Sequence, residues 1–159
     1  MKTVIVDVGE AKSNREISNE ISSSIAGKPD AIILIGHGTN DGREFMGYSG
    51  ADIIKLAYPS IIMLHACDCG KHLIDEIAGL GPTALGHISD IYVNIKDEVP
   101  QTALSVLTLL PKGARCSEIL PSLRKAWFNQ AKTLYDDGEF FRAALVNRLR
   151  FSLRCSERA

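Results

Sequence analysis

The sequence has few aromatic residues, no long apolar run and almost no net charge. Phe, Trp and Tyr together make up 6% of its 159 residues. No apolar segment approaches the roughly 20 residues that a membrane-spanning helix needs, so we expect no membrane partner. Basic residues (18) and acidic residues (19) nearly cancel to a formal charge of −1, which gives no general attraction for nucleic acid. Nucleic acid is therefore not expected as a partner.

Motifs for nucleotides and for secretion are missing as well. Neither a G-x-G-x-x-G pattern nor a Walker loop occurs, so nothing favours a nucleotide cofactor, and we expect no cofactor. The apolar start of the chain meets Asp7 at once and is too short for a secretory signal. Without such a signal, a set of cysteines is more typical of free thiols than of a disulfide framework. We therefore predict a cytoplasmic protein in which Cys116 and Cys155 are inert thiols.

Apolar runs alternate with helical periodicity over the first two-thirds of the chain. Between the runs, Ser13 and Glu16 form a capping box for a helix, and Ser49 is placed to cap a second, short helix. A third helix is expected over residues 71–78. The runs that we predict to be strands are residues 2–8, 31–36, 60–66, 83–88 and 91–95. Strands that alternate with helices predict β-α-β units and a mainly parallel sheet.

The last third has the pattern of helices alone. Pro100 is suited to the first turn of a helix that continues to Pro111, and a second apolar stripe continues to Gly138. From Phe141 to Leu153, apolar residues recur at steps of four, which predicts a helix to the end of the chain. Since no linker interrupts the pattern, we predict a single α/β domain over residues 1–159 with a helical C-terminal portion.

Two of the predicted strands end at chemically active side chains. The run 32–35 leads into Gly36-His37-Gly38, and the run 61–64 leads into His65-Ala66-Cys67-Asp68-Cys69-Gly70. Unbroken Ile and Leu runs are typical of parallel strands that are buried on both faces. In open parallel sheets, chemistry takes place at the carboxyl ends of the strands. A histidine and a cysteine that meet there can act as base and nucleophile, so we predict His37 and Cys67 to be a catalytic dyad.

These motifs resemble the His-Gly and Ala-Cys signatures of the caspase-like cysteine peptidases. The closer similarity is to the bacterial CHAT branch, whose pattern is Gly-His-Gly followed by Ala-Cys-x-Thr/Ser-Gly. Cys69 stands in the Thr/Ser place of this pattern, and Gly70 matches its glycine. The resemblance spans roughly residues 30–95 by motif order. It implies a three-layer caspase-like fold for the whole chain.

The resemblance also implies a function, namely a cysteine endopeptidase that cleaves a separate protein or peptide. His37 would be the general base, Cys67 the nucleophile, and the amides of Gly38 and Cys67 the oxyanion hole. His65 occupies a place that often contributes to the specificity pocket in the relatives, so His65 and Asp68 are the candidate substrate-binding residues. The biological setting that the resemblance implies is bacterial defence or cell death, with a separate activator protein as a further partner.

Other interpretations use the same residues differently. A catalytically silent module could bind a partner through the arginine-rich last helix, with Cys67 as a small buried side chain. The series His65, Cys67, Cys69 and His72 contains ligands that zinc accepts, but its spacing is not that of the usual zinc knuckle, so we predict no metal. Cys69 is expected to pack within a turn, and His65 could equally be a core histidine.

Overall fold

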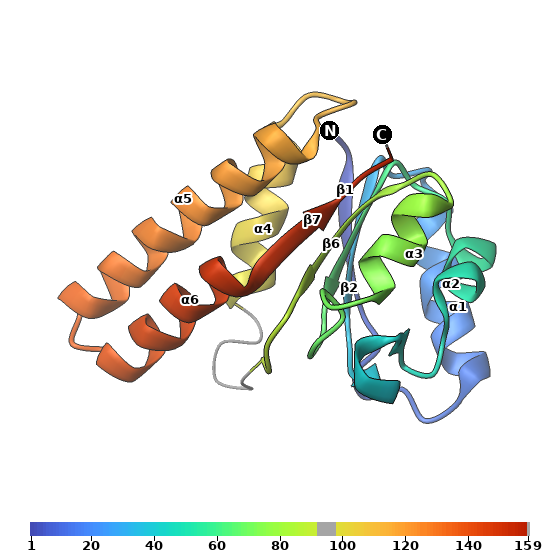
Figure 1. Ribbon diagram of the computed structural model, residues 1–159, viewed down its shortest axis with the longest axis horizontal. Helices are drawn as coiled ribbons and strands as arrows, with labels where there is room; N and C mark the ends of the chain where they lie inside the picture. Colours follow the sequence, from blue (N-terminus) through green and yellow to red (C-terminus); the bar gives the residue numbers. More distant parts are fainter. Residues whose placement is uncertain (92–97, 159) are drawn as a thin grey trace.

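The predicted apolar runs form the centre of one five-stranded sheet. The computed structural model describes residues 1–91 and 98–158 (Figure 1). The sheet has the strand order β1-β2-β5-β6-β7. Its strands are β1 (Thr3–Asp7), β2 (Ala31–Ile35), β5 (Ile61–His65), β6 (Thr83–His87) and β7 (Leu153–Ser156). The first four run parallel, which confirms the prediction of a mainly parallel sheet.

Three helices cover one face of this sheet, as Figure 1 shows. They are α1 (Asn14–Ile25), α2 (Gly50–Leu56) and α3 (Leu73–Gly79). Because the parallel strands follow each other in chain order, right-handed crossovers place all three helices on the same side. Both predicted cap residues are confirmed, since Ser13 accepts from the Glu16 N–H and Ser49 forms a capping box with Asp52. The capping box expected for Ser13 is not formed, because the Glu16 carboxylate accepts from the Lys12 N–H instead. Ile32 and Leu34 of β2 face this layer and contribute to its core.

The other face carries the C-terminal helices α4 (Glu98–Leu109), α5 (Cys116–Asp136) and α6 (Phe140–Ser152). Ile33 and Ile35 of β2 belong to this second core, together with the fully buried Trp127. The Trp127 indole N–H donates to the Val99 carbonyl, which joins α5 to α4. The predicted helical C-terminal portion and the three layers are therefore present. Within the described residues, no helix combines the length and apolarity needed to cross a membrane.

The end of the chain corrects the prediction of a helix that continues to the last residue. Leu153–Ser156 form β7, which pairs antiparallel with β6 and places Leu153 opposite His87. Leu153 continues the four-residue repeat of α6, and its side chain is fully buried in the strand as well. This strand has only four residues and follows the helix without a turn residue. It is too short to show the alternation of apolar and polar residues that predicts a strand.

The strand β7 also brings two cysteines together that we predicted to be free thiols. Cys155 on β7 forms a disulfide with Cys116, the first residue of α5, across a sequence separation of 39 residues. The thiol prediction for this pair is therefore wrong. It rested on the absence of a secretory signal, whereas the pairing depends on where β7 lies. The predicted strand over residues 91–95 is not seen at Ile91, and residues 92–97 lie outside the described chain.

Candidate active site

The register of the sheet aligns His37 with Cys67. Ile35 of β2 is paired with His65 of the neighbouring strand β5, and His37 and Cys67 each follow two residues later. The alignment continues beyond the strands, because the Gly36 N–H donates to the His65 carbonyl at 3.3 Å. Parallel neighbours are about 4.8 Å apart, so the two residues leave the same edge of the sheet on adjacent strands. The sequence-based expectation of a shared edge is met.

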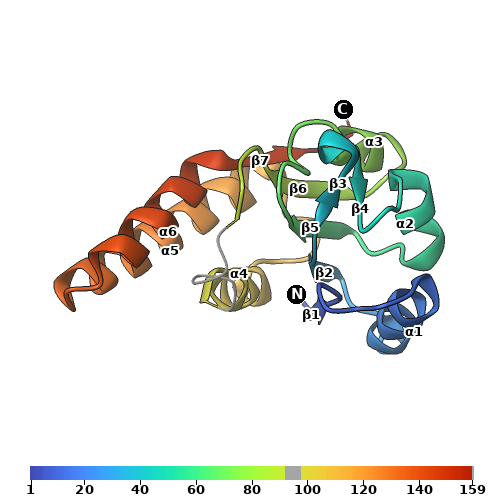
Figure 2. The same cartoon turned by 90° about the horizontal axis from the view of Figure 1, so that it is seen from below.

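The glycines beside His37 are required by close packing. A Cβ on Gly36 would lie 2.7 Å from the ring of Phe45, and a Cβ on Gly38 would lie 1.8 Å from the carbonyl oxygen of Cys67. Gly38 belongs to β3 (Gly38–Thr39), which pairs with β4 (Glu44–Phe45) around the short helix η1 (Asn40–Gly42). This small hairpin lies at the carboxyl edge in Figure 2. The packing joins the histidine loop directly to the cysteine loop.

The side chains of His37 and Cys67 use other hydrogen-bond partners. Nε2 of the exposed His37 lies 3.1 Å from the carbonyl oxygen of Gly9, just beyond β1. The thiol sulfur of the half-buried Cys67 accepts from the Ile91 N–H at 3.2 Å. Gly9 and Ile91 were not singled out from the sequence, because backbone groups in remote loops leave no sequence signal. The imidazole is thus directed toward β1, whereas the thiol bonds to the segment beyond β6.

Two backbone amides lie near this pair. Gly38 is paired with Phe45 in the hairpin, and the Met46 N–H donates to the His37 carbonyl. The Gly38–Phe45 pair is therefore a non-hydrogen-bonded pair, in which the Gly38 N–H points away from β4. Among the hydrogen bonds of the described residues, none uses the Cys67 N–H as donor. These are the amides that the resemblance implies as oxyanion donors.

The residues after Cys67 form a tight turn before α3. Asp68 adopts the left-handed conformation with φ of 60°, and its carboxylate lies 3.1 Å from the Lys71 ammonium. Gly42 of η1 packs against the Asp68 carbonyl, where a Cβ would lie 2.1 Å from the oxygen. Asp68 is therefore at the same edge as His37 and Cys67, but its carboxylate is already paired.

Cys69 is excluded from nucleophilic chemistry by its surroundings. Its side chain is fully buried, and its thiol faces the Glu44 carbonyl at 3.8 Å. Burial, followed by the nearby Cys67 and Asp68, raises the pKa of the Cys69 thiol to about 12. Because the thiolate is the reactive form, this cysteine is inert at neutral pH. The interpretation of Cys69 as a turn-packing residue is confirmed.

His65 lies in the core and does not line the edge. Its side chain is only 2% exposed, and its ring makes an edge-to-face contact with His87 at a centroid distance of 5.8 Å. His87 in turn lies 5.7 Å from the Trp127 ring, and its Nδ1 is 2.8 Å from the Ser152 hydroxyl. This placement agrees with the core-histidine interpretation and separates His65 from any substrate at the edge.

The proposed zinc ligands are not gathered into one site. His65 and Cys69 are buried in the core, whereas His72 is exposed at the start of α3. In residues 1–91 and 98–158, no group of three or more His, Cys, Asp or Glu side chains is arranged to hold a metal ion. The described residues therefore offer no basis for the zinc interpretation.

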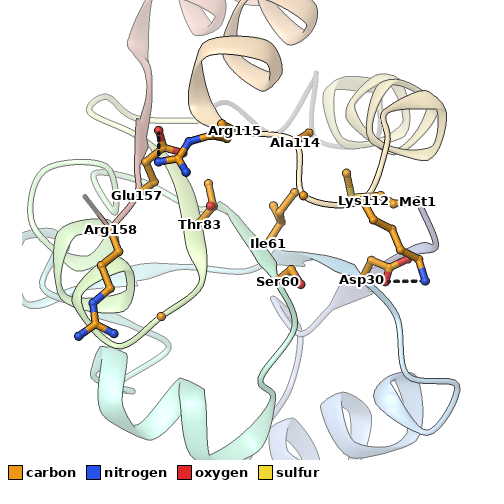
Figure 3. A pocket seen from close by; sticks show the side chains of 12 residues that line it. Met1, Asp30, Ser60, Ile61, Thr83, Lys112, Ala114, Arg115, Glu157 and Arg158 are labelled. Atoms are coloured by element: carbon orange, nitrogen blue, oxygen red, sulfur yellow. Dashed lines mark ion pairs between the residues drawn. The ribbon is translucent and has the colours of Figure 1, made fainter.

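A separate pocket of about 190 Å³ lies at the opposite edge, where the parallel strands begin (Figure 3). Four of its charged side chains form two ion pairs, Lys112 with Asp30 at 3.6 Å and Arg115 with Glu157 at 3.4 Å, and Arg158 lines the pocket as well. Glu157 also accepts from the Cys116 N–H, so the disulfide borders this pocket. Because Lys112 and Arg115 are each held by an acid and Arg158 is exposed, we rank this pocket below the carboxyl edge as a candidate site.

No family model and no curated protein matches this chain. The fold and the edge nevertheless define a class of protein, a three-layer α/β domain with a histidine and a cysteine at the carboxyl ends of adjacent parallel strands. The arrangement provides a thiol, an imidazole and two backbone amides within one edge. These groups are the components of thiol-dependent acyl transfer.

Proposed function

We propose that this protein is a cysteine endopeptidase of the caspase-like, CHAT type, which cleaves a separate protein. The observation that carries the proposal is the register that aligns His37 with Cys67 on adjacent strands. Support also comes from the Gly38–Cys67 backbone contact, which holds the two loops together. We further infer a setting in bacterial defence or cell death, with a separate activator, from the motif resemblance alone.

The proposed reaction forms and then hydrolyses a thioester. His37 takes the proton of the Cys67 thiol, and the resulting thiolate attacks the carbonyl carbon of the substrate peptide bond. The amides of Gly38 and Cys67 stabilise the oxyanion, and each such donor contributes on the order of 3 kcal/mol. Collapse breaks the C–N bond, and the leaving amine receives the proton from His37. Water, deprotonated by His37, then hydrolyses the thioester and regenerates the thiol.

The reaction requires a movement of the His37 ring. In the resting arrangement Nε2 is bonded to the Gly9 carbonyl, and the Cys67 sulfur is bonded to the Ile91 amide. His37 is exposed, so its ring has room to rotate about the Cα–Cβ bond toward β5. Only the rotated form places base and thiol together, so the proposal requires the free protein to populate it. Substrate or activator binding at this edge would stabilise it further.

The second candidate is a catalytically silent module that binds a partner. The observation that favours it is the same pair of hydrogen bonds, which occupy the imidazole and the thiol separately. The arginines of the predicted last helix were expected to carry this binding, but Arg142 of α6 is paired with Glu98, and Arg154 lies on β7 and is paired with Asp75. Under this interpretation Cys67 has ordinary thiol reactivity.

We also propose a cytoplasmic location, since a reducing compartment keeps the Cys67 nucleophile as a thiol. The disulfide between Cys116 and Cys155 is unusual for that compartment. The two statements concern different cysteines. Protein isolated in the presence of an alkylating reagent tests both, because Cys67 should be labelled as a thiol whereas Cys116 and Cys155 should not.

The test is mass-spectrometric mapping of a limiting dose of iodoacetamide at about pH 6. A thiol with an ordinary pKa near 8.5 is almost entirely protonated at this pH, so only an activated cysteine reacts quickly. We expect selective labelling of Cys67 that is lost in His37→Ala. His72→Ala, which removes an exposed histidine elsewhere, is the matched control and should label like the wild type.

Cys69 serves as an internal reference in the same experiment, because its buried thiol should stay unlabelled in every variant. Slow labelling of Cys67 that does not depend on His37 would overturn the dyad and favour the silent module. Rapid labelling in both the wild type and His37→Ala would likewise remove His37 from the proposed mechanism.

A further inference from the structure

The helical hairpin formed by α5 and α6 projects beyond the sheet. Figures 1 and 2 both show its far end, around residues 136–140, standing clear of the other elements. Of the nine large hydrophobic residues that are exposed in the described chain, five lie on this hairpin. They are Phe128, Tyr135, Phe140, Phe141 and Phe151. Exposed aromatic side chains that gather on one element mark an interaction surface more often than a solvated one.

Most of these residues line a groove between the two helices, which has a volume of about 510 Å³. Its floor consists of small residues, and its walls are aromatic. The apolar residues that define this hairpin groove are Phe128, Ala131, Tyr135, Phe140, Ala143 and Ala144, and the polar Lys132 and Asn147 line it as well. Their spacing places them on one face of each helix. An alanine floor between aromatic walls accepts the side chains of another helix at close range.

Aromatic contacts define the two ends of the hairpin groove. At the tip, the Tyr135 and Phe140 rings lie 4.9 Å apart, across the turn that joins the helices. At the base, the Arg150 guanidinium lies 4.8 Å from the Phe128 ring and 4.3 Å from the Phe151 ring. Aromatic side chains are therefore present at both ends of the hairpin groove.

The charges along the hairpin have opposite signs at its two ends. The tip carries the exposed acids Asp136, Asp137 and Glu139. The base carries cations on both helices, namely Arg124, Lys125, Arg148 and Arg150. A surface with this polarity is self-complementary when it meets an identical surface in the antiparallel direction. An occupant with one uniform charge would be repelled at one of the two ends.

We propose that the hairpin groove is the interface of a two-fold symmetric dimer with a second copy of this chain. The two hairpins run antiparallel and form a four-helix bundle, so that the acidic tip of each lies against the basic base of the other. The aromatic walls of one copy pack over the alanine floor of its partner. This interface is at a distance from the carboxyl edge of the sheet, and the proposal does not depend on the peptidase function.

Analytical ultracentrifugation over a concentration series tests the dimer. We expect the wild-type chain to dimerise below about 100 μM, within the usual range of specific protein interfaces. Ala144→Glu places a charge on the exposed floor and should raise the dissociation constant at least about tenfold. Leu80→Glu makes the same kind of change at an exposed residue that follows α3, and should leave dimerisation unchanged.

A charge exchange tests the antiparallel arrangement directly. The tip variant carries Asp137→Lys and Glu139→Lys, and the base variant carries Lys125→Glu, Arg148→Glu and Arg150→Glu, so that the net charge of the altered end is reversed in each. Each variant alone should be monomeric, since its tip and base then have the same sign. An equimolar mixture of the two should form a heterodimer, because each end again faces the opposite charge. Circular dichroism of each variant establishes that it is folded.

A wild-type chain that stays monomeric at about 100 μM would overturn the proposal. A dimer that survives Ala144→Glu would place the interface elsewhere and would overturn it as well. Two charge variants that fail to associate when mixed would contradict the antiparallel arrangement, even if the wild type were dimeric.

Discussion

At the scale of single residues, the glycines that flank His37 explain how the His37 and Cys67 motifs come into contact at one edge of the sheet. Gly36 makes room for the Phe45 ring, and Gly38 lets the histidine loop touch the Cys67 carbonyl. The close contact seen here is within the protein itself, and it positions the Gly38 and Cys67 amides relative to each other.

Replacement of Gly38 by alanine should destabilise the fold and displace the cysteine loop. The new Cβ would lie 1.8 Å from a backbone oxygen, which cannot rotate away as a side chain would. Overpacking of this kind costs about 1–3 kcal/mol in the free energy of unfolding. Urea denaturation monitored by circular dichroism measures the change. Gly79→Ala is the matched control, because nothing lies within 4 Å of its added Cβ and alanine is the better helix former. Equal stability of both variants would contradict the contact.

At the scale of elements, the short strand β7 determines how the C-terminal helices are attached. It extends the sheet beyond β6 and carries Cys155 to the start of α5, where the Cα atoms of the disulfide lie 5.7 Å apart. The helical period of α6 was predictable, since apolar residues recur at steps of four. The change from helix to strand at Leu153 was not, because the pairing partner on β6 is about 65 residues earlier in the chain.

Removal of the disulfide should lower the stability of the whole chain. A link between residues 39 apart restricts the unfolded ensemble and contributes about 2–4 kcal/mol in the chain-entropy account. Cys116→Ser, or reduction of the wild type, should shift the urea midpoint of unfolding by a corresponding amount. Alkylation of the unfolded chain provides the control, with two labelled cysteines before reduction and four after it. Four labelled cysteines without reductant would show that the disulfide is not formed.

At the scale of the whole molecule, the buried histidines connect the central sheet to the C-terminal layer. His87 of β6 contacts Trp127 of α5 and Ser152 of α6, and it is fully buried. Burial, together with the neighbouring His65, lowers the pKa of His87 to about 3. His87 is therefore neutral in the folded protein at all but strongly acidic pH, whereas in the unfolded chain it takes up a proton below about pH 6.5.

The sign of this linkage predicts a loss of stability in acid. Between about pH 6.5 and pH 3 the unfolded state binds the additional proton, so the unfolding free energy falls as the pH falls, by up to roughly 1.4 kcal/mol per pH unit. His87→Asn keeps a polar group near Ser152 and should show a shallower pH dependence, although it is less stable at pH 7. His72→Gln, at an exposed position, should retain the wild-type slope. An unchanged slope in His87→Asn would contradict the assignment.

The parallel sheet, its covering helices and the shared edge follow from local sequence patterns. Unbroken apolar runs specify buried parallel strands, helical spacing specifies the covering helices, and strand-end placement put His37 and Cys67 at one edge, because these are local patterns. The partners of these side chains, the burial of His65 in the core and the disulfide between Cys116 and Cys155 could not be predicted from such patterns. These outcomes depend on contacts between residues that lie far apart in the chain, and such contacts exist only once the sheet and both helical layers have assembled.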